Sequence, residues 1–149
     1  MIKRFSSMKL FRKIFVFLAL MVLLQNSCRN DYKHPVPDVY VDLLVNINTH
    51  YELQNVNGFI YKNDYGFNGI VIFRYSLNEF MAFDRACPHH PYEYDCRIEV
   101  KEPPLAIDEC CSSRYLLLDG SVVDGPSKHP LKQYRTFFDA ERNYLQITN

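Results

Sequence analysis

Hydrophobic and polar positions alternate with a period close to two over much of the chain. The alternation is clearest in residues 39–48, where valine, leucine or isoleucine fills every second position. Because successive side chains of a β-strand point to opposite faces, this pattern predicts a strand with one buried face. Short runs rich in β-branched and aromatic residues, separated by turn residues, predict further strands at 59–61, 69–75, 80–83, 97–101, 105–107, 115–118, 122–123, 134–138 and 144–148. No helical stripe of useful length follows residue 28, so an all-β domain is expected.

The first 27 residues follow a different pattern. Five basic residues and no acidic residue precede an unbroken apolar run at 14–24. Since about 20 residues are needed to span the hydrocarbon of a bilayer, this run better fits the apolar segment of a secretory signal. Ser27 and Cys28 follow it, which predicts a lipoprotein signal peptide at 1–27 with cleavage before Cys28. An ordinary secretory signal and an uncleaved anchor are the alternatives.

Acyl chains on Cys28 would hold the mature chain on a membrane. We therefore expect an exported protein anchored in the bacterial cell envelope, on the periplasmic side or at the outer membrane. Residues 28–37, which are polar and contain proline, predict a short tether, and residues 38–149 predict a single domain. Without the five basic residues of the leader, the mature chain has 12 basic and 17 acidic residues, a net charge of −5. This charge argues against nucleic-acid binding, which needs a basic surface.

Residues with reactive or metal-binding side chains gather in two segments between predicted strands. The first is Cys87-Pro88-His89-His90 and the second is Asp108-Glu109-Cys110-Cys111. Loops that leave a sheet commonly carry binding residues, and Cys and His side chains bind iron, zinc or copper. With Cys28 set aside, four cysteines remain, which in an oxidising compartment indicates disulfides or metal ligation.

The order of residues around these segments resembles the Rieske family. Its members carry a box Cys-x-His, a second box Cys-x-x-His-Gly-Ser-x-Phe/Tyr, and then Gly-x-Val-x-x-Gly-Pro and Pro-Leu. This chain has, in that order, Cys87-Pro88-His89, Ser113-Arg114-Tyr115, the match at 120–126, and Pro130-Leu131. With its leader it looks like Rieske-like lipoproteins of the Bacteroides group. The resemblance implies an antiparallel three-sheet β domain in which two loops at one tip hold a [2Fe–2S] cluster.

The second box departs from the family pattern. Aligned through the tail, Asp108 takes the place of the cysteine and Cys111 takes that of the histidine. Cys87 and His89 carry over as candidate ligands, and Cys111 could bind in the histidine's place. Asp108, or Cys110 after a shift of the loop, would complete the set. The leader also lacks a twin arginine, and general secretion of an unfolded chain weighs against a cluster inserted in the cytoplasm.

Three interpretations stay open at this point. The first is a [2Fe–2S] electron-transfer or redox protein that acts with an unknown redox or envelope partner. The second is a cluster-free binding or structural module. In it, the disulfide between the two loops of Rieske proteins would fall on Cys96 and Cys110 and contribute about 3 kcal/mol, leaving Cys87 and Cys111 close together. The third is a zinc site formed by Cys87, His89, Cys110 and Cys111.

A catalytic role finds little support in the sequence. It contains no serine elbow, phosphate-binding loop or carboxylate pair with a catalytic spacing. The chain is also too short to add the mononuclear-iron domain of a Rieske oxygenase. We therefore expect an electron carrier or a binding module rather than an enzyme. Separately, we expect His90 to be an exposed loop residue rather than a ligand.

Overall fold

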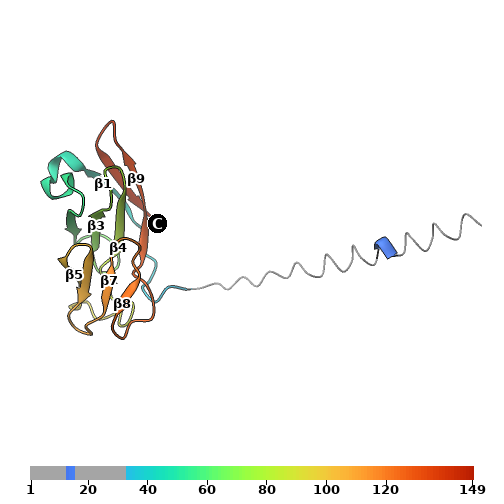
Figure 1. Cartoon of the computed structure of the whole chain (residues 1–149). Helices are drawn as coiled ribbons and strands as arrows, with labels where there is room; N and C mark the ends of the chain where they lie inside the picture. Colours follow the sequence, from blue (N-terminus) through green and yellow to red (C-terminus); the bar gives the residue numbers. More distant parts are fainter. Residues whose placement is uncertain (1–12, 16–32) are drawn as a thin grey trace, which may run out of the picture. The chain divides into compact units, whose positions relative to one another are not determined.

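The computed structural model describes residues 13–15 and 33–149 (Figure 1). Residues 13–15 are helical and belong to a unit of their own, residues 1–33, whereas residues 34–149 form a second compact unit. The rest of the predicted signal peptide lies outside the described residues, as does the predicted lipidation site Cys28. Within the described ranges, no helix is long and apolar enough to cross a membrane.

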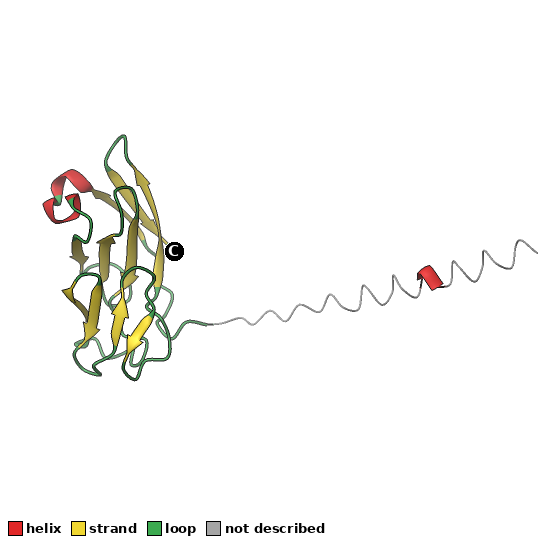
Figure 2. Ribbon diagram, viewed as in Figure 1, coloured by secondary structure: helices red, strands yellow, loops and turns green. Residues whose placement is uncertain are grey.

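Residues 34–149 are built from β-strands joined by loops (Figure 2). The strands are β1 (Asp42–Asn46), β2 (Phe59–Lys62), β3 (Ile70–Arg74), β4 (Phe80–Asp84), β5 (Ile98–Glu102), β6 (Leu105–Asp108), β7 (Arg114–Leu116), β8 (Val122–Asp124), β9 (Gln133–Asp139) and β10 (Tyr144–Thr148). Two short 3-10 helices follow β1, η1 (Ile47–Thr49) and η2 (Tyr51–Gln54). Each predicted strand segment overlaps one of these strands, and every pairing between them is antiparallel. The predicted antiparallel all-β fold class is therefore confirmed.

The strands pack as three layers. Hydrogen bonding joins the first two layers into one six-stranded sheet in the order β1-β10-β9-β4-β3-β2, and the third layer is the sheet β5-β6-β7-β8. Within the six-stranded sheet, β4 and β9 share the fewest paired residues. Their pairing consists of Ala82 with Tyr134 and Phe83 with Gln133. The sheet folds over at this junction, so that β1 and β10 face β2, β3 and β4 across a shared core.

Two hydrophobic cores fill the spaces between the layers. The first lies inside the folded six-stranded sheet and includes Val41, Leu43, Val45, Ile70, Ile72, Leu145 and Ile147. The second lies between β3–β4 and the four-stranded sheet and includes Val71, Phe73, Phe83, Ile98, Tyr115, Leu117 and Cys87. β3 is consequently buried on both faces, which explains its unbroken apolar run. Cys87 belongs to this second core, so packing fixes one of the candidate site residues.

The end of the predicted tether packs against the domain. Val36 is 1% exposed, and the backbone oxygens of Val36 and Pro37 accept hydrogen bonds from the buried Lys132 Nζ at 3.3 and 2.5 Å. His34 Nε2 lies 2.9 Å from the Pro130 carbonyl oxygen. Residues 34–37 therefore belong to the compact unit 34–149, and they supply acceptors for the Lys132 charge, which is almost fully buried.

A buried carboxylate joins the layers at the end of β4. Asp84 has no exposed surface, and its Oδ2 accepts hydrogen bonds from Phe67 N (2.6 Å) and the Tyr134 hydroxyl (2.7 Å). Its Oδ1 accepts from Asn68 N (3.2 Å) and Ala86 N (2.8 Å). These four donors come from the turn before β3, from β9 and from the first residues after β4. Asp84 therefore sets the direction in which the chain leaves β4 toward Cys87.

Replacing Asp84 with alanine is expected to lower the free energy of unfolding by about 3 kcal/mol or more, because it leaves several buried donors without an acceptor. Urea denaturation followed by circular dichroism measures this change. Asp139 is the matched control, since its Oδ1 accepts from Glu141 N and Arg142 N in an exposed turn. Asp139→Ala should cost about 1 kcal/mol or less. Equal losses in the two variants would contradict the role given to Asp84.

Candidate metal site between two loops

The first loop of the site, residues 85–97, joins β4 to β5 and is closed at its base. Arg85 N donates to Gly69 O and Ile98 N donates to Arg85 O, each at 2.8 Å, and Ala86 pairs with Arg97 as an antiparallel bridge. The Arg85 guanidinium lies over the Tyr61 ring at 3.9 Å from its centroid. Both ends of the loop therefore leave the sheet side by side, and Cys87 begins the loop from a fixed position.

A turn in this loop decides which histidine faces the site. His90 N donates to Cys87 O at 3.2 Å, which closes a four-residue turn with Pro88 in its second position, where proline is favoured. The turn brings His90 back beside Cys87, and its side chain is only 14% exposed. His89 is exposed at the outside of the turn.

The structure places the two histidines differently from the expectation. The motif nominated His89 and treated His90 as an exposed residue, but His90 is the one that approaches the other candidate ligands. The signal for His90 was present in the sequence, since proline after Cys87 favours a turn whose first and fourth residues are adjacent.

The second loop, residues 109–113, joins β6 to β7 and is held by its own hydrogen bonds. Asp108 N donates to Ser113 O at 2.9 Å, and Asp108 Oδ1 accepts from Cys110 N at 2.8 Å. Ser112 adopts a positive φ of 60°, which reverses the chain between Cys111 and Ser113. A tight turn of this kind points consecutive side chains in different directions.

The glycine-proline tail noted in the sequence supports this loop from behind. Gly125 has φ +101°, and a Cβ added to it would lie 2.5 Å from Ser113 Cα. Only glycine permits this approach. Ser127 N in turn donates to Ser113 Oγ at 3.1 Å. The tail is therefore a backbone support for the second loop.

A disulfide ties the two loops together. Cys96 and Cys110 are bonded with an S–S distance of 2.02 Å, the pair that the family resemblance implied. Cys110 is therefore not available as a substitute ligand for Asp108, nor as a member of the zinc set considered from the sequence. Of the cysteines in the described residues, Cys87 and Cys111 are the free ones.

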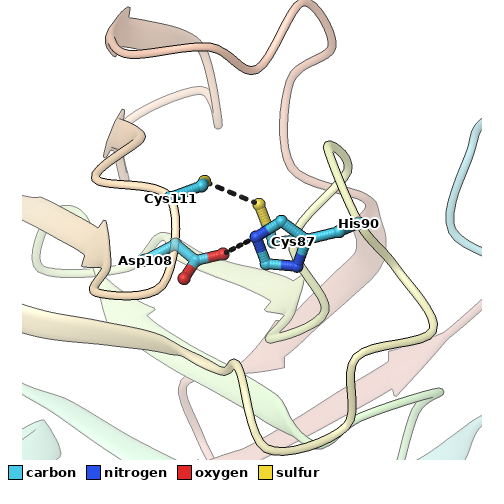
Figure 3. Close-up of side chains that lie close together, drawn as sticks. All are labelled: Cys87, His90, Asp108 and Cys111. Carbon is cyan, nitrogen blue, oxygen red and sulfur yellow. Dashed lines mark hydrogen bonds and ion pairs between the residues drawn. The ribbon is translucent and has the colours of Figure 1, made fainter.

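Four side chains converge where the loops face each other (Figure 3). Their ligand atoms, contributed by Cys87, His90, Asp108 and Cys111, all lie within 4.8 Å of one another. Cys87 Sγ and Cys111 Sγ are 3.7 Å apart, and His90 Nε2 and Asp108 Oδ2 are 3.0 Å apart. The two loops thus present two sulfurs, one nitrogen and one oxygen to a common centre.

The histidine and the carboxylate of this group have buried polar atoms without hydrogen bonds, which is unusual. Asp108 has no exposed surface, yet neither Asp108 Oδ2 nor the two ring nitrogens of His90 has a hydrogen bond. The contact between His90 Nε2 and Asp108 Oδ2 is close enough for an ion pair but lacks hydrogen-bond alignment. Because buried polar atoms are nearly always satisfied, orphaned atoms that converge with two thiols indicate a place for a cation.

The thiol of Cys87 is held in a protonated state by its surroundings. Burial raises the pKa of Cys87 to about 12, and the neighbouring Asp108 carboxylate adds to the rise. Its Sγ lies 3.3 Å from the Tyr115 hydroxyl, whose pKa is raised by burial and by Cys87. Cys111 Sγ donates to Ser113 Oγ at 3.1 Å. A bound cation would favour the thiolate forms of Cys87 and Cys111 instead, because a coordinating thiol loses its proton.

The separations suit one tetrahedral ion. In a zinc site with Zn–S bonds of about 2.3 Å, two thiolate sulfurs lie about 3.8 Å apart, close to the 3.7 Å between Cys87 and Cys111. The set is compatible with a metal or an iron–sulfur site, but it departs from the two cysteines and two histidines of a Rieske cluster. Asp108 supplies an oxygen, and His90 is the single histidine of the group.

Comparisons with known proteins give the fold a distant neighbour. No protein-family model matches the chain, and no curated protein matches it. Among solved structures, it is similar to a protein assigned as the NADH-dependent nitrite reductase small subunit of Mycobacterium tuberculosis, with 14% sequence identity and a TM-score of 0.46. The match covers 75% of this chain and 97% of that one.

In the metal-free protein, Cys111 should react with iodoacetamide at pH 8 at least about 100-fold faster than Cys87. Only the thiolate is nucleophilic, and Cys87 is fully buried with a pKa of about 12. As the pH is raised toward that pKa, the reaction rate of Cys87 should increase about tenfold for each pH unit, because the fraction of thiolate increases tenfold. Quantifying both peptides over time by mass spectrometry tests this, and equal rates at pH 8 would contradict it.

Proposed function

We propose that this chain is an envelope-anchored domain that binds one metal ion through Cys87, His90, Asp108 and Cys111. The observation that carries the proposal is the convergence of four donor atoms within 4.8 Å, two of which, His90 Nε2 and Asp108 Oδ2, are buried atoms without a hydrogen bond. Two sulfurs, a nitrogen and an oxygen are a donor set for a borderline divalent ion such as zinc.

The residues around the four ligands would support such an ion. The Tyr115 hydroxyl lies 3.3 Å from Cys87 Sγ, and it stays protonated because burial raises its pKa. It can therefore donate a hydrogen bond to a Cys87 thiolate. Ser113 Oγ is placed in the same way beside Cys111 at 3.1 Å. Hydrogen bonds to ligand atoms fix their orientation and tune the affinity for the metal.

The Rieske resemblance supplies the second candidate, a [2Fe–2S] redox centre in a lipoprotein of the Bacteroides type. Two observations favour it: the ordered tail match from Ser113 to Leu131, and a Cys96–Cys110 disulfide at the place implied by that family. The ligand replacements at Asp108 and Cys111 favour the single ion. The same measurement separates the two candidates, because a cluster brings two irons, two sulfides and visible absorption.

Anchoring through Cys28 is the part of the proposal that concerns location. It rests on the basic start, the apolar run at 14–24 and the Ser27-Cys28 pair. With a net charge of −5 for the mature chain, electrostatic attraction to anionic lipids would not hold the domain. The acyl chains on Cys28 would therefore provide the attachment.

Purified anaerobically from residue 29 onward, the protein should contain about one zinc or other divalent ion per chain. This fragment includes both cores and the whole compact unit 34–149. His90→Ala should weaken zinc binding at least about 100-fold, because it removes a ligand. Elemental analysis and titration with zinc in competition with a chromogenic chelator measure the content and the affinity.

His89→Ala is the matched control for this prediction, because His89 is adjacent but exposed and should leave affinity unchanged. Circular dichroism and an intact Cys96–Cys110 bond show whether each variant is folded. Two irons and two sulfides per chain would replace the single ion with the cluster. A folded wild-type protein that takes up no zinc, iron or sulfide would overturn the metal-binding function and leave a disulfide-stapled module.

Expressed with its leader in a bacterial host, the full chain should incorporate labelled palmitate and sediment with membranes. Cys28→Ser should abolish the label and release the chain from membrane fractions, since it removes the acylated atom. Labelling with immunoblotting of the fractions provides the measurement. Unchanged fractionation of Cys28→Ser would instead support an uncleaved anchor.

A further inference from the structure

The two free cysteines of the site are placed as a pair. Cys87 and Cys111 come from different loops, and their sulfurs are 3.7 Å apart, whereas Cys96 and Cys110 are already bonded to each other. Forming a second disulfide requires the sulfurs to approach to about 2.05 Å, a closing movement of about 1.6 Å. The first disulfide keeps the loops facing each other, which holds this gap small.

We infer that Cys87 and Cys111 are a redox-active thiol pair that exchanges with disulfides of a dithiol partner, and that the metal ion binds its reduced form only. The metal part of this inference rests on the proposed function. The pairing of the thiols rests on their geometry alone. His90 forms no bond in the exchange, so a His90 variant can separate the two properties.

The exposure of the two residues assigns their order in the reaction. Cys87 is completely buried against Tyr115 in the second core, whereas Cys111 is partly exposed at the loop. A partner sulfur can therefore reach Cys111 but not Cys87. Cys111 takes the first step and Cys87, from inside the domain, takes the second.

The exchange balances without any further reactant. The Cys111 thiolate attacks one sulfur of the partner disulfide, forming a mixed disulfide and releasing one partner thiolate. The Cys87 thiol then gives up its proton, which the first partner thiolate takes up, and its sulfur attacks Cys111 Sγ. The Cys87–Cys111 bond forms, and the second partner thiolate leaves and takes up the proton that Cys111 had lost. The pair loses two electrons and two protons in total, and the partner gains both. Reduction of the pair is the same sequence in reverse.

The ion and the disulfide compete for the same two sulfurs. Oxidation removes two of the four ligands and leaves His90 and Asp108, so the ion is released. By mass action, a free ion concentration 100 times its Kd should raise the ratio of oxidised to reduced reagent needed for half-oxidation about 100-fold. The site would then hold metal under reducing conditions and release it when oxidised.

The test is equilibration of the protein from residue 29 onward with graded ratios of oxidised to reduced dithiothreitol, with and without zinc. Acid quenching, alkylation and peptide mapping then quantify the Cys87–Cys111 bond separately from the Cys96–Cys110 bond. We expect the Cys87–Cys111 bond to form, with its midpoint shifted about 100-fold by zinc. Cys111→Ser shows the background of the mapping, and His90→Ala keeps both thiols but lacks a ligand.

The outcomes distinguish this inference from the proposed function. A bond in both wild type and His90→Ala, with the zinc shift in wild type only, supports both. Wild-type protein that binds zinc but forms no Cys87–Cys111 bond at any ratio overturns the thiol pair and leaves the metal site standing. A bond that forms equally with and without zinc, in a protein that binds no zinc, supports the thiol pair and overturns the metal site.

Discussion

The carboxylate of Asp84 is the interaction on which the arrangement of the domain depends. It accepts hydrogen bonds from the turn before β3, from Tyr134 on β9 and from Ala86, immediately before Cys87. Strand pairing alone joins β4 to β9 at only two positions. The buried carboxylate therefore strengthens the point at which the six-stranded sheet folds over, and it aims the first loop at the site.

The site has a fixed side and a more accessible side. Cys87 and Asp108 have no exposed surface and are held by the second core and by the end of β6. Cys111 lies on a short loop that depends on Ser112 at positive φ and on the close approach of Gly125. The disulfide of Cys96 and Cys110 holds these two sides together. Two loops held in this way keep the four candidate ligands close together, although no single strand or helix carries all of them.

Much of the fold could be read from the sequence, because alternation reports which residues share a face of a strand. That alternation predicted the strands, including β1 and β10, which are the first and last strands of the domain in the sequence. It could not show that these two strands pair, since their contacts join residues about 100 positions apart and leave no local trace. It also could not show that residues 34–37 pack on the domain, because their attachment depends on the buried charge of Lys132.

The candidate site was predictable in part. Cys87, Asp108 and Cys111 followed from the motif and its alignment, and the structure brings them together. His89 was nominated in place of His90 because a motif counts positions along the chain, whereas the turn at Pro88 decides which side chain faces inward. The orphaned atoms of His90 and Asp108 had no sequence signal at all, since satisfaction of a buried group depends on three-dimensional surroundings.

The adjacency of Cys110 and Cys111 has a consequence for how the protein matures. Four thiols can pair completely in three ways, and exchanging these two neighbours requires only a twist of one short loop. A chain that joined Cys96 to Cys111 would carry one loop-to-loop disulfide like the native chain, but its Cys110 would stand in the ligand position. Correct assembly therefore requires selection between two neighbouring cysteines, because only the Cys96–Cys110 bond leaves Cys111 beside Cys87, His90 and Asp108.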